Sequence, residues 1–113
     1  MNIVGDVGGK NCLIIDDMCD TGGTICKVAE ALKKAGANDI YACFSHAVLS
    51  GRAIETIAAS HLKKVIVTNT IPLCEKGKIL VGQDRIEVLS IGPLLANGIK
   101  SIHDETSVSS LFI

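Results

Sequence analysis

Residues 11–35 read NCLIIDDMCDTGGTICKVAEALKKA, and this stretch decides the fold. Its first part, residues 11–15, is a short and continuously apolar run, which is typical of a strand buried on both faces of a parallel sheet. Its last part, residues 24–35, carries apolar residues at helical spacing and ends before Gly36, a natural helix stop. The inward positions of this helix are Ile25, Val28, Ala29 and Leu32. The sequence therefore predicts a strand, a tight polar loop and a helix in immediate succession.

The alternation of strand and helix continues downstream. Further strands are predicted at 40–44, 65–68 and 87–91. Ser50 can cap a second helix that runs to about Ala59, and Pro93 suits the first turn of a last helix. The apolar face of that last helix consists of Leu95, Gly98, Ile99 and Ile102. This order predicts a single domain, residues 1–113, with an α/β fold of three layers, α/β/α, around a mostly parallel sheet.

The segment 73–85 does not fit the alternation clearly. Residues 79–81 are apolar, and residues 82–84 read GQD, a sequence that favours a turn. We interpret residues 79–81 as one arm of a hairpin that turns at 82–84.

Composition and charge exclude several classes of function. The chain has 113 residues, a net charge of −1 and 3% aromatic residues, so neither a basic surface nor stacking platforms for nucleic acid are expected. No apolar stretch reaches the roughly 18 residues that a membrane span needs. Five scattered cysteines and the lack of a recognisable signal peptide predict reduced thiols and a cytoplasmic protein.

The polar loop, DDMCDTGGT at residues 16–24, carries the functional signal. In an open parallel sheet, ligands bind at the carboxyl ends of the strands, which is where this loop lies. Gly22 and Gly23 allow close approach of a ligand to the backbone, and Thr24 opens a helix whose first N–H groups lack internal partners. Such a helix start favours a phosphate group. Asp16 and Asp17 would then lie one sugar length away, facing hydroxyl groups or a metal ion.

Other interpretations of these motifs remain open or are excluded. An ordinary capped loop would explain Asp20 and the glycines, but it leaves the adjacent carboxylates Asp16 and Asp17 without a use. Residues 5–10, GDVGGK, lack the spacing of a nucleotide P-loop and precede a strand instead of following one. The three cysteines that are spaced by seven fall on a strand, a loop and a helix, which argues against a shared zinc site. They are Cys12, Cys19 and Cys26.

Four segments together resemble a known family. They are GDVGGKNCLIIDDMCDTGGT at 5–24, SHAVLSGRAIE at 45–55, VTNTIPL at 67–73 and SVSSLF at 107–112. The loop DDMCDTGGT resembles the phosphoribosyl-diphosphate loop of type I phosphoribosyltransferase-like folds. The surrounding segments are similar to the C-terminal third of the ribose-phosphate diphosphokinase (PRPP synthetase) family. The resemblance covers essentially the whole chain and implies a partial, incomplete phosphoribosyltransferase-like domain.

The resemblance implies roles for particular residues. It assigns binding of the 5-phosphate of ribose 5-phosphate to Asp20, Thr21, Gly22, Gly23 and Thr24. Asp16 and Asp17 would face the ribose hydroxyls, directly or through Mg²⁺. Ser107 and Phe112 would contribute to an allosteric nucleotide site between subunits, so the resemblance also implies a homo-oligomer.

The family transfers a diphosphate group from ATP to ribose 5-phosphate and releases AMP and 5-phosphoribosyl 1-diphosphate. The ATP-contacting N-terminal half, the pyrophosphate loop and the basic flexible loop of the family have no counterpart in these residues. We therefore expect this chain to bind ribose 5-phosphate, to need the missing half for ATP, and to be inactive by itself. No catalytic residue is assigned. Two alternatives remain, a non-catalytic regulatory or scaffold homologue of the same enzyme and a base phosphoribosyltransferase.

Overall fold

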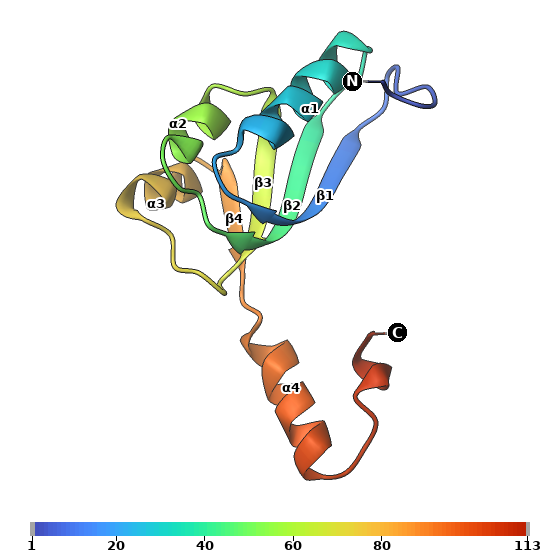
Figure 1. Cartoon of the computed structure of the whole chain (residues 1–113), viewed down its shortest axis with the longest axis vertical. Helices are drawn as coiled ribbons and strands as arrows, with labels where there is room; N and C mark the ends of the chain where they lie inside the picture. Colours follow the sequence, from blue (N-terminus) through green and yellow to red (C-terminus); the bar gives the residue numbers. More distant parts are fainter. Residues whose placement is uncertain (1, 113) are drawn as a thin grey trace.

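The computed structural model describes residues 2–112, so that Met1 and Ile113, the two ends of the predicted domain, lie outside the described residues. Four strands alternate with four helices, and a short 3-10 helix follows (Figure 1). The strands are β1 (Cys12–Cys19), β2 (Ile40–Ala47), β3 (Leu62–Thr68) and β4 (Ile86–Leu89). The helices are α1 (Gly23–Lys34), α2 (Ala53–Ala58), α3 (Glu75–Gly82), α4 (Gly92–His103) and the 3-10 helix η1 (Ser109–Phe112). The predicted α/β class is confirmed.

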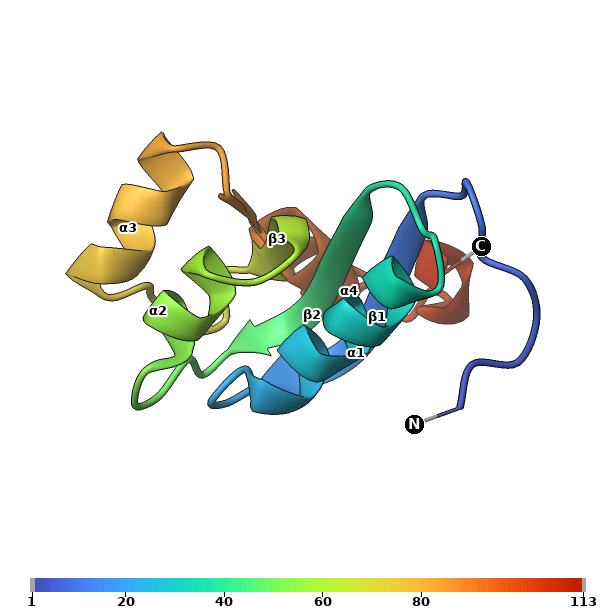
Figure 2. The same cartoon turned by 90° about the horizontal axis from the view of Figure 1, so that it is seen from above.

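The strands form one parallel sheet in the order of the sequence, β1-β2-β3-β4. Right-handed crossovers between sequential parallel strands bring each connecting helix to the same side of a sheet. Accordingly, α1, α2 and α3 all cover one face (Figure 2). Ala42, Val65 and Ile86 are paired side by side on this face and are each at most 1% exposed. The core of the protein therefore lies between the sheet and these three helices.

The opposite face of the sheet is open over the described residues. Side chains alternate along a strand, so Leu13 and Ile15 of β1 face away from the helices. Their exposed fractions are 56% and 75%. Residues 2–112 thus supply two layers of the predicted α/β/α arrangement, one of helices and one of strands, and do not themselves form the third.

The segment before β4 forms a helix and not a hairpin, so the interpretation of residues 79–81 as a strand is wrong. Leu80 of α3 is 5% exposed and belongs to the core. Gly77 of α3 is buried, and a Cβ atom at this position would lie 3.3 Å from the Cβ of Leu73, which is closer than an ordinary contact. Asp84 then turns the chain into β4 with a positive φ of 57°.

The last helix leaves the sheet. Figure 1 shows α4 extending away from the carboxyl edge of the sheet, and no residue of α4 is buried. The radius of gyration is 16.4 Å, compared with about 13 Å for a compact chain of this length. The apolar face predicted for this helix is therefore exposed, apart from its contacts with η1.

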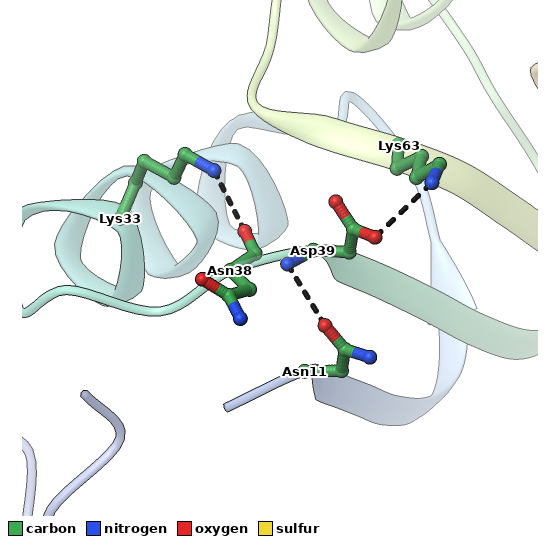
Figure 3. Close-up of polar contacts among 5 residues, drawn as sticks. All are labelled: Asn11, Lys33, Asn38, Asp39 and Lys63. Atoms are coloured by element: carbon green, nitrogen blue, oxygen red, sulfur yellow. Dashed lines mark hydrogen bonds and ion pairs between the residues drawn. The ribbon is translucent and has the colours of Figure 1, made fainter. Parts of the chain in front are cut away.

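Polar contacts join the elements at the amino edge of the sheet (Figure 3). The backbone N–H of Asp39 donates to the Oδ1 of Asn11 at 3.2 Å, which links the starts of β1 and β2. The Nζ of Lys63 lies 3.1 Å from the Oδ2 of Asp39, which links β3 to the same point. These contacts lie at the end of the sheet opposite the polar loop.

None of the helices formed by residues 2–112 has the length and apolar character that crossing a bilayer requires.

Candidate functional site

A hollow of about 220 Å³ lies at the carboxyl end of β1, where the chain passes into α1. Its lining consists of Asp16, Met18, Cys19, Asp20, Thr21, Gly22, Gly23, Thr24 and Ile25. Six of the seven residues predicted to bind a sugar phosphate are among these, since only Asp17 is missing. Strand β1 is longer than expected, so Asp16, Asp17 and Met18 belong to the strand and the loop begins at Asp20. The structure thus brings most of the predicted site together in one place.

The two adjacent carboxylates do not face the hollow together. Successive residues of a strand point to opposite faces, which directs Asp16 toward the hollow and Asp17 toward the open face of the sheet. Each carboxylate accepts a hydrogen bond from the next backbone N–H, Asp16 from Asp17 and Asp17 from Met18, both at 2.8 Å. Asp16 is therefore the better placed of the two for a ligand in the hollow.

The two glycines have different surroundings. Gly22 is buried and has a positive φ of 82°, a conformation that side chains disfavour. Its carbonyl oxygen accepts the first bond of α1, from the N–H of Cys26 at 3.0 Å. Gly23 is partly exposed, and a Cβ atom there would lie 4.0 Å from the hydroxyl oxygen of Thr21, without a clash. Gly22 therefore shapes the turn, and Gly23 and Thr24 present their backbone to the hollow.

The start of α1 has no side-chain cap. The first N–H groups of a helix lack intrahelical partners and carry partial positive charge. At Gly23 and Thr24 these groups border the hollow, where they form an arrangement suited to a small anion. Asp16, at the opposite part of the lining, is suited to hydroxyl groups or a hard metal ion.

Asp20 is bonded to the loop after β2. The hydroxyl of Ser50 donates to the Oδ1 of Asp20, and the backbone N–H of Ser50 donates to the carbonyl oxygen of Asp20 at 2.9 Å. The prediction that Ser50 caps the second helix by its side chain is wrong, because α2 begins at Ala53 without a side-chain cap bond. Sequence reasoning missed this contact, although the carboxyl ends of neighbouring parallel strands always meet at one edge.

Cys19 lies beneath the loop and is 3% exposed. Burial, helped by the nearby Cys26, Asp16 and Asp20, raises the pKa of its thiol from 9.0 to about 11, against a smaller effect of the Gly22 backbone N–H. Burial also raises the pKa of Cys26. Both cysteines are therefore protonated at neutral pH and poorly suited to nucleophilic or metal chemistry.

The described residues offer few metal ligands. Between residues 2 and 112, no three His, Cys, Asp or Glu side chains form a group that could hold a metal ion. Mg²⁺, however, keeps several waters and is commonly held by one or two carboxylates and by substrate oxygens. The Asp16 carboxylate fits that chemistry as a single oxygen ligand. His46, beside Met18 in the sheet register, has its Nδ1 2.8 Å from the hydroxyl of Thr70.

The two residues predicted for an allosteric site lie in the tail. The hydroxyls of Ser107 and Ser109 are 2.7 Å apart, and Phe112 is 73% exposed. Phe112 borders an apolar hollow of about 260 Å³ between α4 and η1. Both residues belong to the segment that follows α4, which is drawn in red in Figure 1 and does not reach the loop between β1 and α1.

Comparisons with known proteins find matches along almost the whole chain. The family model for the phosphoribosyl synthetase-associated domain matches residues 1–113. A ribose-phosphate pyrophosphokinase of Caldanaerobacter subterraneus subsp. tengcongensis is 52% identical over 112 residues, and one of Listeria ivanovii is 53% identical over 112 residues. Each match covers 99% of this chain and 34% of the relative. A crystal structure of phosphoribosylpyrophosphate synthetase from Mycobacterium smegmatis superposes with a TM-score of 0.82 and 43% identity, over 90% of this chain and 33% of that chain.

The chain therefore belongs to the phosphoribosyl synthetase-associated domain family. The predicted resemblance to the ribose-phosphate diphosphokinase family is confirmed. The chain spans about a third of the length of the curated relatives that it matches.

Proposed function

We propose that this chain is the ribose-5-phosphate-binding portion of a ribose-phosphate diphosphokinase, which transfers a diphosphate group from ATP to ribose 5-phosphate. The observation that carries this proposal is the hollow that has open helix N–H groups at Gly23 and Thr24 and a carboxylate at Asp16. The 5-phosphate would occupy the helix start, with Asp20, Thr21 and Gly22 completing the loop around it. The ribose hydroxyls would then face Asp16. The names of the relatives favour this enzyme over a base phosphoribosyltransferase.

Mg²⁺ fits the site through Asp16, with waters and substrate oxygens as the other ligands. When bound, it would neutralise negative charge on the phosphate groups. Asp17, which faces the open side of the sheet, is the weaker candidate for this role. The chain's own contribution is to bind the sugar phosphate and hold it in one orientation, and such positioning is a large part of catalysis in phosphoryl transfer.

Transfer itself needs groups that lie outside the site described here. The two arginines of the chain are Arg52 and Arg85, and neither lines the hollow. A positioned arginine is worth about 10³–10⁵ in the rate of phosphoryl transfer. The 113-residue chain should therefore bind ribose 5-phosphate without making 5-phosphoribosyl 1-diphosphate. Oligomerisation, ATP binding by a further N-terminal half and nucleotide binding at Ser107 and Phe112 belong to the same proposal.

The test is a titration of the 113-residue chain with ribose 5-phosphate, followed through its backbone amide signals by NMR. Signals of Gly22 to Thr24 should shift in the wild-type chain, and in the Asp20→Ala/Thr24→Ala variant the same shifts should require a higher concentration of ribose 5-phosphate. Release of AMP from ATP in the presence of Mg²⁺ and ribose 5-phosphate should remain at background. Shifts spread over the surface without a change at the loop would overturn the proposed binding site. Clear turnover would overturn the expectation that this chain binds ribose 5-phosphate without catalysing the transfer.

A further inference from the structure

Asp20 is placed where an aspartate would ordinarily block the site. Asp20 lies two residues before Gly22, the N-cap residue of α1. The carboxylate of an aspartate commonly accepts the backbone N–H two residues further along the chain. In this chain that N–H belongs to Gly22, which borders the hollow together with Gly23 and Thr24. A carboxylate that accepted this N–H would occupy the phosphate position with the chain's own negative charge.

The structure shows a different arrangement. Helix α1 has no side-chain cap bond, and the Oδ1 of Asp20 accepts the hydroxyl of Ser50 instead. Ser50 comes from the segment after β2, thirty residues further along the chain. The carboxylate that could cap the helix is thus engaged by a neighbouring loop.

The segment that carries Ser50 is itself held firmly against the phosphate loop. The N–H of Leu49 donates to the carbonyl oxygen of Cys19 at 2.9 Å, and the N–H of Ser50 donates to that of Asp20 at 2.9 Å. Leu49 has a positive φ of 46°, a conformation that non-glycine residues rarely adopt. Surrounding structure must fix such a conformation, and the Leu49 side chain does pack against the core. The position of the Ser50 hydroxyl is therefore built into the fold.

We propose that Ser50 is a positioning residue of the phosphate site, which holds the Asp20 carboxylate away from the N–H groups at the start of α1 and so keeps these groups open for the ligand. This inference rests on the proposed binding of ribose 5-phosphate and adds a residue to it. Loss of the Ser50 hydroxyl frees the carboxylate to bond the N–H groups of Gly22 and Gly23. The Asp20 carboxylate then occupies the start of the helix, and a dianionic ligand has to displace this carboxylate before it can bind.

The proposal predicts effects of opposite sign on binding and on local stability. In Ser50→Ala, ribose 5-phosphate should bind roughly ten- to 150-fold more weakly, which corresponds to one hydrogen bond of a charged group. The midpoint of thermal unfolding should not fall, since a new cap replaces the lost contact. Ser50→Thr retains a hydroxyl and should bind like the wild type. Ser60→Ala, at the other end of α2, removes a hydroxyl bonded to the Ile57 carbonyl at 2.7 Å and should leave affinity unchanged.

A double-mutant cycle decides whether Ser50 acts through Asp20. The Ser50→Ala effect on affinity should disappear in the Asp20→Ala background, because no carboxylate remains to form the internal cap. A Ser50→Ala effect of the same size in both backgrounds would overturn the proposal. Unchanged affinity of Ser50→Ala for ribose 5-phosphate would overturn it as well, while leaving the proposed function intact.

A ligand-free measurement separates this proposal from the proposed function. Amide hydrogen exchange at Gly22 and Gly23 should be slower in Ser50→Ala than in the wild type, because the freed carboxylate accepts these N–H groups. Equal exchange rates in the two chains would overturn the positioning role, even where wild-type binding is normal. If the wild type fails to bind ribose 5-phosphate, the proposed function fails, and the exchange rates still decide the role of Ser50.

Discussion

At the scale of single residues, Gly22 is the position where backbone conformation decides the loop. Its φ of 82° directs the chain from β1 into α1, and no side-chain cap compensates for a change there. A side chain in the left-handed region costs roughly 1–2 kcal/mol. The neighbouring Gly23 has ordinary helical geometry at the first position of the helix.

We expect Gly22→Ala to lower the free energy of unfolding by about 1–2 kcal/mol. Gly23→Ala is the matched control and should be neutral or slightly stabilising, because alanine is the better helix former and the position is open. Urea denaturation of both variants and the wild type measures the difference. Equal losses in the two variants would contradict the role assigned to the Gly22 conformation.

The buried Cys19 thiol makes a second prediction, which concerns pH. Its pKa is raised in the folded chain, so the thiol favours the folded state fully below pH 9.0 and loses this effect as the pH rises to about 11. The two-unit shift corresponds to about 2–3 kcal/mol.

Unfolding by urea at several pH values between neutral and pH 11 tests this expectation under reducing conditions. The wild type should lose more stability across that range than Cys19→Ala, in which the buried thiol is absent. Cys74→Ala removes an exposed thiol and should follow the wild-type curve. A Cys19→Ala curve parallel to the wild type would show that this thiol does not control the alkaline loss.

At the scale of elements, Arg85 links the carboxyl end of α2 to the start of β4 by hydrogen bonds. Its guanidinium donates to the carbonyl oxygens of Ile57, Ala58 and Leu62, at 3.1, 3.2 and 3.0 Å. The last carbonyl groups of a helix lack internal partners, and a cation at that end also interacts favourably with the helix dipole. The side chain thus stabilises a helix of only six residues.

Replacing Arg85 by Met should destabilise the protein by about 2–3 kcal/mol, since hydrogen bonds to a charged group are lost and the partly buried carbonyl oxygens of Ile57 and Leu62 lose their donor. Arg52→Met is the control, because Arg52 lies at the amino end of the same helix, where a positive charge is not favoured. Thermal unfolding of both variants provides the comparison. A larger loss in Arg52→Met than in Arg85→Met would contradict this account.

Most elements were predictable because their patterns are strong. The helix expected at 24–35 is α1 almost residue for residue, and its buried Ile25 and Ala29 are among the expected inward positions. The helix α3 was not predictable in this way, because its three apolar residues 79–81 are consecutive and show no helical spacing. Strand β1 runs further than expected, because the prediction followed the apolar run and the carboxyl end of the strand is polar. Polar residues are tolerated there because β1 has a neighbouring strand on one side only and an open face.

The candidate site was predictable as a position along the chain but not in its contacts. The order of strand, loop and helix places residues 16–24 at the edge where ligands bind. Asp16 and Asp17 are successive residues of a strand, so their carboxylates point to opposite faces. This separation could be predicted only if β1 was known to extend to Cys19. The hydrogen bond between Ser50 and Asp20 joins two loops that are thirty residues apart in the sequence, so no local sequence pattern predicts it.

At the scale of the whole molecule, two apolar surfaces are exposed. One is the open face of the sheet, where Ile15 is 75% exposed, and the other is the face of α4, where Ile99 and Ile102 are each 70% exposed. Parallel sheets are ordinarily covered on both faces. Exposed apolar patches and sheet edges favour association.

We expect the 113-residue chain to self-associate increasingly with protein concentration, as measured by light scattering. Ile15→Asp and Ile99→Asp should each shift the distribution toward the monomer, because a charge on either surface must be desolvated on association. Lys27→Ala changes the net charge by the same amount at an exposed position of α1 and serves as the control. A wild-type chain that remains a monodisperse monomer with a sharp melt at high temperature would contradict this prediction.

The order of the strands has a consequence for how the protein folds. Each strand pairs with the one that precedes it in the sequence, from β1 to β4. A growing polypeptide can therefore add one strand and one helix at a time to an existing edge, without waiting for a later segment to be inserted between strands already paired. Domains fold from the N-terminus during synthesis, so β1, the loop and α1 are available for pairing first. The phosphate loop would then be formed as soon as the segment through Ser50 has left the ribosome, before α3, β4 and α4 have emerged from it.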